Sequence, residues 1–407
     1  MYQVAMYLYL VGVAAASLFS AKVRKMWLGQ RRAVATLRSR AVPGGRYVWF
    51  HAASLGEFEQ GRPLMEAIRA AHPEYRILLT FFSPSGYEVR KDYPGADIVC
   101  YLPIDTLLNA RRFLGAVNPE MAFFIKYEFW YNYMHTLSRR GIPVYSASCI
   151  FRPGQVFFRW YGRQYARVLG CVTRFFVQDR RSAELLASIG FHNAEVAGDT
   201  RFDRVLQIRD AARHIPVAAA FAKGARVMVA GSTWPPDEDI LAGFFNTHPG
   251  WKLIVAPHVT SPGHIADIAA KLGGGAVFYT KCSEEEAARA HYMVVDCIGL
   301  LSSIYRYGCA AYVGGGFGVG IHNVLEAAVW GVPVVFGPNN RRFREARGLI
   351  AAGGGVEISS PEDFEAAMGR IGAGGAEMGC AAARYVESLA GATGRILRAT
   401  GLAAGQG

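Results

Sequence analysis

The sequence predicts an α/β protein made of two doubly wound domains that follow one another along the chain. Its 407 residues exceed the usual length of one domain and indicate two or three. Short β-branched and aromatic runs alternate with segments of helical period, as in a mostly parallel sheet covered on both faces. This alternation stops in a polar, charged stretch near residues 205–222 and then restarts. With 52% hydrophobic residues the chain can fill two cores, which excludes global disorder.

The expected strands divide evenly between the two domains, and helices fill the gaps between them. They cover residues 47–50, 77–82, 97–101, 121–125, 143–147 and 174–178, and then 226–232, 253–257, 276–280, 293–296, 310–315 and 333–337. The expected division is an apolar anchor with a basic collar at 1–40, a first domain at 41–205, a linker at 206–222 and a second domain at 223–407, whose last helix could cross back. Such domains face a cleft, and their ligands bind at loops that follow strands.

The first forty residues predict an association with a membrane. No charged side chain occurs in residues 1–21, and about 20 apolar residues suffice to span a bilayer. Seven positive charges follow before any acidic residue, at Lys22, Arg24, Lys25, Arg31, Arg32, Arg38 and Arg40. Such a collar is typical of the cytoplasmic face of a membrane. A cleavable signal peptide, which normally carries its charges before the apolar run, and a buried amphipathic helix are the alternatives.

The charge and the cysteines narrow the classes of function. With 44 Lys and Arg against 32 Asp and Glu, the net charge is +12, which indicates an anionic partner. More than half of that charge lies in the collar, so an anionic membrane surface is favoured over nucleic acid. The seven cysteines are widely spaced with no CxxC pair, which is typical of buried thiols in a reducing compartment. We expect neither a metal site nor a cofactor.

Two charged residues follow expected strands of the first domain, and a third lies at the end of that domain. Glu57 opens a helix after the strand at 47–50, where the helix dipole would keep it ionised as a general base. Glu128 follows the strand at 121–125, at the same expected edge of the sheet, and Arg201 could neutralise a leaving phosphate. The alternatives are helix capping for Glu57, a salt bridge to Lys126 or an arginine for Glu128, and a surface salt bridge for Arg201.

The second domain carries a glycine-rich loop at residues 314–320, followed by an expected helix. Its glycines, Gly315, Gly316 and Gly318 among them, would let the backbone approach a phosphate, with the helix N-terminus as a further donor. Asn323 and Glu326 would share one face of that helix, and Glu326 could accept hydrogen bonds from a ribose. Ser232 and Thr233 could bind an anion, and His258 a phosphate or a base. Tight packing of the loop on the sheet is the alternative.

Taken in order, these segments resemble the bacterial transferases of 3-deoxy-D-manno-octulosonic acid (Kdo). The matching pieces are HAASLGE, KYEFW, GDTRFD, AGSTW, YVGGGFG, HNVLEAA and VPVVFGPNNRRF, which extend to about residue 350. The resemblance implies the two-domain GT-B glycosyltransferase fold, a catalytic base at Glu57 and a stabilising carboxylate at Glu128. Contacts with CMP would map to Pro257 and His258, to Ile298, Gly299 and Leu300, and to Asn323, Val324, Leu325 and Glu326.

Two positions depart from the family pattern. The family usually has Lys where this chain has Arg201, and commonly Arg where this chain has His258. The implied reaction is inverting transfer of Kdo from CMP-Kdo to a lipid A precursor, lipid IVA, at the cytoplasmic face of the bacterial inner membrane. The alternatives are another GT-B enzyme, such as a UDP-sugar transferase or epimerase, and a non-catalytic membrane-bound relative.

Overall fold

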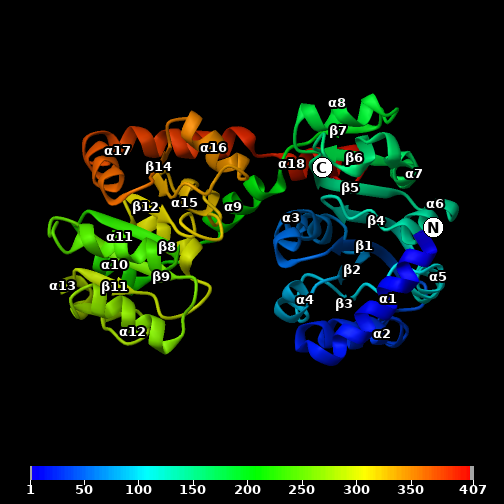
Figure 1. The fold of residues 1–407 in the computed structure, drawn as a ribbon, viewed down its shortest axis with the longest axis horizontal. Helices are drawn as coiled ribbons and strands as arrows, with labels where there is room; N and C mark the ends of the chain where they lie inside the picture. Colours follow the sequence, from blue (N-terminus) through cyan, green and yellow to red (C-terminus); the bar gives the residue numbers. More distant parts are fainter. Residues whose placement is uncertain (1, 404–407) are drawn as a thin grey trace. The chain divides into compact units, whose positions relative to one another are not determined.

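The computed structural model describes residues 2–403, which form two compact units (Figure 1). The first unit contains the chain up to Arg204 together with the segment from Ala390, and the second contains Val205–Leu389. The C-terminal segment therefore joins the first unit. The linker expected at 206–222 is helical, because α9 (Thr200–Asp210) and α10 (Pro216–Ala222) occupy most of it.

The first unit holds a seven-stranded parallel sheet in the order β3-β2-β1-β4-β5-β6-β7. Its strands are β1 (Arg46–Ala52), β2 (Tyr75–Phe81), β3 (Ile98–Tyr101), β4 (Pro119–Ile125), β5 (Val144–Cys149), β6 (Arg174–Val177) and β7 (Ala194–Val196). Its helices are α1 (Tyr2–Phe19), α2 (Ala21–Arg40), α3 (Leu55–Ala71), α4 (Pro84–Arg90), α5 (Leu107–Ala116), α6 (Tyr131–Arg139), α7 (Arg163–Ala166), α8 (Arg180–Ser188) and α18 (Ala392–Ala399).

The second unit repeats this architecture in the order β10-β11-β9-β8-β12-β13-β14, again with parallel pairs. Its strands are β8 (Val227–Thr233), β9 (Lys252–Pro257), β10 (Ala276–Phe278), β11 (Tyr292–Val294), β12 (Ala310–Val313), β13 (Val334–Phe336) and β14 (Gly355–Glu357). Its helices after α10 are α11 (Pro235–Phe245), α12 (Pro262–Lys271), α13 (Glu284–Arg289), α14 (Leu301–Ile304), α15 (Leu325–Ala328), α16 (Arg344–Ala351) and α17 (Pro361–Leu389).

The central strand β1 explains why the first sheet is covered on both faces. Tyr47 and Trp49 belong to a core with Ala33 and Leu37 of α2, whereas Phe50 belongs to a second core with residues of α3 and with Ile396 of α18. Because successive side chains of a strand point to opposite faces, a strand that is apolar throughout requires helices on both sides. The same requirement draws α18 back to the first unit.

The N-terminal region is built into the first unit. Two fully buried residues of α2 pack into the core, so the expected collar lies on a helix docked against the sheet. Among the described residues, α1 is the helix long and apolar enough to cross a membrane. Its start is tied down by hydrogen bonds from Tyr2 to Asp105 and from Gln3 to Asn132. At its other end the guanidinium of Arg24 donates to the last carbonyl groups of α1.

Candidate active site

Glu57 lies in the first turn of α3, directly after β1, and is 7% exposed. Its Oε2 accepts hydrogen bonds from the backbone N–H of Ser54 at 2.9 Å and from the Ser54 hydroxyl at 3.3 Å. In this capping box the carboxylate satisfies an N–H group that the helix leaves open. The capping role considered as an alternative is thus present, and it holds the carboxylate at the edge of the sheet.

The pKa of Glu57 is raised above its ordinary value. The largest cause is burial, which disfavours the charged form, and the next is the negative charge of nearby Glu128. The positive charge of Lys126 and the N–H of Ser54 lower the pKa and offset part of this effect. A carboxylate with a raised pKa is a stronger base than an exposed one, as a group that must accept a proton requires.

Glu128 lies in the loop between β4 and α6 and is held by an aromatic donor. The indole N–H of Trp130 lies 3.0 Å from Oε2 of Glu128 and 3.1 Å from Nε2 of His51. Among residues 2–403, no lysine or arginine lies within ion-pair distance of Glu128, so the salt bridge considered for it does not form. Since β1 and β4 are neighbours in the sheet, Glu57 and Glu128 follow adjacent strands.

His51 is fully buried at the end of β1, and its hydrogen bonds define its tautomer. An indole nitrogen only donates, so Nε2 of His51 accepts from Trp130. Its Nδ1 lies 2.9 Å from the hydroxyl of Thr80, which also accepts from the indole of Trp49. These contacts fit a neutral imidazole that carries its proton on Nδ1.

Strained backbone marks the carboxyl edges of both sheets. In the part of the chain that the structure describes, three residues other than glycine have positive φ: Lys126 at 62°, Ser148 at 52° and Ser232 at 54°. Each lies at or just after the end of a strand, β4, β5 and β8 respectively. Non-glycine residues are rare in this conformation and concentrate at functional sites, so this strain agrees with a site at these edges.

Arg201 pairs with a buried carboxylate at the start of α9. Its Nε lies 2.9 Å and its Nη2 2.8 Å from Oδ2 of Asp199, which also accepts from the side chain of Gln60. Burial raises the pKa of Asp199, but the charge of Arg201 and these hydrogen bonds outweigh it and lower the pKa overall. The salt bridge considered for Arg201 therefore exists, although its acidic partner is buried and not at the surface.

In the second unit, Asp237 organises the loops that follow β8 and β12. It is fully buried and accepts hydrogen bonds from the hydroxyl of Tyr312 at 2.7 Å and from the N–H groups of Trp234 and Gly315, each at 2.9 Å. Two segments distant in sequence, 234–237 and 312–315, therefore meet at one carboxylate. The N–H of Gly315 is used by Asp237, so the backbone of this glycine has no free donor for a phosphate.

The other glycines of the 314–320 loop serve close packing for the most part. A Cβ on Gly314 would meet the carbonyl of Ser232 at 2.4 Å, and one on Gly316 would meet Cα of Gly337 at 2.5 Å. Gly315 and Gly320 have positive φ, whereas a Cβ on Gly318 would meet nothing within 4 Å. The packing alternative explains four of these glycines, and Gly318 alone of the five keeps open space beside it.

The helix expected after this loop is reduced to one turn. α15 begins at Leu325 after Val324, so residues 320–323 are irregular and no long helix N-terminus follows the glycines. The side-chain amide of Asn323 donates to Glu326 at 3.1 Å, and its oxygen accepts from the N–H of Leu325 at 3.2 Å. The hydroxyl of Ser302 donates to the other oxygen of Glu326. The expected pairing of Asn323 with Glu326 on one face exists as a direct hydrogen bond.

His258 belongs to an aromatic cluster at the end of β9. The imidazole is exposed, stacks on Trp234 with 4.9 Å between ring centroids, and lies 4.6 Å from the ring of His322. The Trp234 indole donates to Nε2 of His322 at 3.2 Å. Burial, and then the neighbouring His258, lower the pKa of His322. Pro257, which precedes His258, is buried.

The remaining predicted contacts are the Thr233 hydroxyl and the loop of residues 298–300. Thr233 was expected to offer its hydroxyl to an anion. The structure shows instead that this hydroxyl is buried and donates to Glu238 at 3.0 Å. Ile298 is 88% exposed and Gly299 has a φ of 98°, in a loop that Leu300 joins to α14. Within residues 2–403, no three His, Cys, Asp or Glu side chains are grouped so that they could hold a metal ion.

The fold matches that of solved nucleotide-sugar enzymes. A UDP-GlcNAc 2-epimerase from Neisseria meningitidis, solved with UDP-GlcNAc, superposes with a TM-score of 0.59, covering 87% of this chain and 99% of that one at 12% identity. This likeness shows the fold alone. Two parallel, doubly wound units of this kind define the GT-B class.

Sequence comparisons show which proteins the chain is similar to. Residues 26–204 match the family described as 3-deoxy-D-manno-octulosonic-acid transferase (kdotransferase). The chain is 25% identical to the 3-deoxy-D-manno-octulosonic acid transferase of Aquifex aeolicus over 78% of this chain and 83% of that protein. It is 26% identical to that of Chlamydophila psittaci over 77% and 75%. The chain is therefore similar to the Kdo transferases, over residues 26–204 for the family as a whole and over about three quarters of its length for these relatives.

Sequence reasoning missed several residues of these sites. His51 and Trp130 lie within the segments HAASLGE and KYEFW, but neither of them was expected to have a role in a site. Asp199 could have been predicted from the segment GDTRFD, because a carboxylate two residues before an arginine can form an ion pair with it. Asp237 opens a helix in an ordinary capping position, and nothing in the sequence places it beside Tyr312 and Gly315.

Proposed function

We propose that the chain is an inverting glycosyltransferase that moves Kdo from CMP-Kdo to a lipid A precursor such as lipid IVA. The observation that carries this proposal is the carboxylate of Glu57, which is buried and hydrogen-bonded to Ser54 at the carboxyl edge of a parallel sheet. Its pKa is raised by burial and by the charge of Glu128. A base of this kind suits deprotonation of a sugar hydroxyl. The family relationship supplies the donor and the acceptor class.

In the proposed reaction, Glu57 takes the proton of an acceptor hydroxyl as its oxygen attacks the anomeric carbon of Kdo. The bond between that carbon and the phosphate oxygen of CMP breaks, and its electron pair leaves with CMP. Positive charge develops on the sugar in such a transition state, so the carboxylate of Glu128 is assigned to its stabilisation. Direct displacement from one face inverts the anomeric configuration.

The nucleotide is assigned to the second unit. Glu326, hydrogen-bonded to Asn323 and Ser302, is a fixed acceptor suited to ribose hydroxyl groups. The exposed imidazole of His258 on Trp234 offers a flat face for a base or a donor for the phosphate. Arg201, which forms an ion pair with Asp199, is assigned to the leaving phosphate.

The cytoplasmic face of the inner membrane is the proposed location. The exposed apolar residues of α1 include Val4, Leu8, Val11, Leu18 and Phe19. Because both ends of α1 are held to the first unit, we propose that it lies along the membrane surface and does not span it. The positive charges of α2 would then face anionic headgroups.

A donor comparison tests this function. Purified full-length protein is incubated with CMP-Kdo, generated in situ, and a tetraacylated lipid A precursor, and the lipid product is weighed by mass spectrometry. A mass gain of one or more Kdo units supports the proposal. The epimerase likeness makes a UDP-sugar enzyme the second candidate. Binding of UDP in preference to CMP, with no Kdo transferred by folded protein, would favour that candidate and contradict the proposal.

A further inference from the structure

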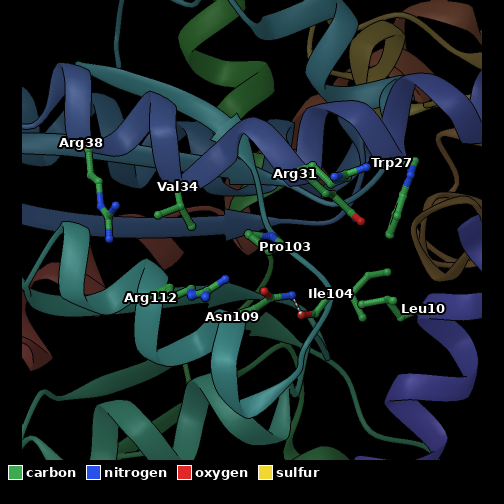
Figure 2. Close-up of a pocket in the computed structure, with 10 residues that line it drawn as sticks. Leu10, Trp27, Arg31, Val34, Arg38, Pro103, Ile104, Asn109 and Arg112 are labelled. Carbon is green, nitrogen blue, oxygen red and sulfur yellow. Dashed lines mark hydrogen bonds between the residues drawn. The ribbon is translucent and has the colours of Figure 1, made fainter.

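A polar cavity of about 450 Å³ lies in the first unit, between the two N-terminal helices and α5 (Figure 2). Leu10 of α1, five residues of α2, and Asn109 and Arg112 of α5 contribute to its wall. It shares no residue with the site of Glu57 and Glu128. None of the described residues that line it is acidic.

Three arginines give the cavity a strong positive charge. Arg31 and Arg38 come from α2 and Arg112 from α5, and Figure 2 shows Arg38 and Arg112 extending from these two helices. None of the three guanidinium groups has an ion-pair or hydrogen-bond partner among the described residues, although Arg31 lies 5.7 Å from the ring centroid of Trp27. Guanidinium groups gathered without carboxylates favour a phosphate, which they bind with two parallel hydrogen bonds.

Gln30 provides a second, independent observation. Its side chain lines the cavity and is 3% exposed, yet neither its Nε2 nor its Oε1 has a hydrogen-bond partner. Buried polar groups in folded proteins are nearly always hydrogen-bonded, so an amide with both atoms unpaired points to a polar group that occupies the cavity. The amide nitrogen can donate to a phosphate oxygen, and the amide oxygen can accept from a hydroxyl.

The apolar part of the wall suits the hydrocarbon part of a lipid. Leu10 belongs to the exposed apolar helix α1, and Trp27 carries an amphipathic ring of the kind found at membrane interfaces. We propose that this cavity binds the phosphate ester and a hydroxyl of an anionic phospholipid headgroup, with the acyl chains running along α1. The site would seat one membrane lipid and fix the orientation of the protein on the bilayer. It does not rest on the proposed sugar transfer.

A soluble short-chain lipid tests the proposal on the full-length protein. Binding of dihexanoyl phosphatidylglycerol, below its micelle concentration, is measured by calorimetry beside inorganic phosphate and dihexanoyl phosphatidylcholine. We expect the anionic lipid to bind and the two other probes to bind at least tenfold more weakly. Equal binding of inorganic phosphate would overturn the lipid assignment. Binding of the tetraacylated phosphorylated glycolipid, without binding of the phosphatidylglycerol, would also overturn it.

Matched variants separate this cavity from general attraction between charges. Arg31→Gln with Arg112→Gln removes two charges that line the cavity, whereas Arg32→Gln with Arg111→Gln removes two charges of the same helices that do not line it. We expect the first pair to weaken binding at least tenfold and the second less than twofold. Equal losses would contradict the proposal.

The variant Gln30→Leu tests whether Gln30 binds the ligand or only supports the fold, because the two roles predict opposite changes in Tm. We expect it to raise the Tm of the lipid-free protein, because it removes two unpaired buried atoms, and to weaken lipid binding. A lower Tm with unchanged lipid affinity would contradict the assignment of Gln30.

Discussion

The imidazole of His51 and the carboxylate of Glu128 approach to 3.7 Å, between Nε2 and Oε2, with the indole N–H of Trp130 directed at both atoms. Because the indole can only donate, both facing atoms act as acceptors, and the contact is not an ion pair. Trp130 therefore fixes Glu128 without neutralising its charge. A carboxylate held in this position can stabilise positive charge that develops on a sugar.

Removing the indole donor tests this arrangement. Trp130→Phe keeps an aromatic ring but loses the hydrogen bonds to Glu128 and His51. A hydrogen bond to a charged group contributes about 1.5–3 kcal/mol, so we expect Kdo transfer to slow roughly ten- to hundredfold. The measurement is kcat with CMP-Kdo and the lipid precursor. Trp160→Phe, at a residue 86% exposed, is the control and is expected to keep normal activity. Equal rates in the two variants would refute the role of Trp130.

The pH profile of transfer reports on Glu57. We expect kcat/KM to rise with pH through the raised pKa of Glu57 and to level off above it, because only the ionised carboxylate accepts a proton. Lys126→Met removes a charge that lowers this pKa, so the acidic limb should move to higher pH. Glu128→Gln removes a charge that raises it, so the limb should move to lower pH. Shifts of the same sign in both variants would show that another group titrates.

The pair of Arg201 and Asp199 predicts a stability effect. Since the folded-state pKa of Asp199 is lowered, its ionised form stabilises the fold above the unfolded pKa, and this contribution is lost as pH falls through the folded pKa. Removing one partner of a buried pair costs about 3–5 kcal/mol. We expect Arg201→Met to lower the free energy of unfolding by that amount at pH 7 and by less in acid, with Arg201→Lys intermediate. Denaturant titrations at several pH values measure it, and an unchanged stability at pH 7 would exclude the pair as a stabilising contact.

The exposed imidazole of His258 predicts an effect on the nucleotide alone. Stacking of a base on an aromatic side chain contributes about 1–3 kcal/mol, so His258→Ala should weaken CMP binding roughly tenfold. Calorimetry with CMP measures this affinity. His291→Ala, at another exposed histidine of the second unit, should leave it unchanged. If His258→Ala binds CMP normally, Trp234 and His258 do not form part of the nucleotide site.

Much of the fold could be predicted from the sequence because apolar runs of buried parallel strands are continuous and separated by helical segments. Each of the expected strands overlaps a strand of the structure. The strands β7 and β14 were missed, because each has only three residues and one of the three is a glutamate. The other three-residue strands, β10, β11 and β13, are apolar throughout and were predicted. The recruitment of α18 by the first unit depends on packing that no local pattern records.

The candidate site could be predicted less completely. Glu57 and Glu128 could be placed at one edge because both follow strands of a parallel sheet. The glycine-rich loop was interpreted as a phosphate site, yet the same glycines are required where it packs against Ser232 and Gly337. Glycine is required wherever another group approaches the backbone closely, and the sequence does not show whether that group belongs to a ligand or to the protein. Buried partners such as His51 and Asp237 become visible only when distant segments are brought together.

The transfer rate of Glu57→Gln tests the central claim most directly. Gln can keep the capping contact with Ser54 but cannot accept the proton, so we expect the variant to fold and to lose Kdo transfer by at least a thousandfold. Glu59→Gln, two residues along the same helix, is the matched control and should keep most of the activity. The measurement is single-turnover transfer from CMP-Kdo to the lipid precursor, beside circular dichroism of each variant. Near-normal transfer by folded Glu57→Gln would contradict the assignment of Glu57 as the base.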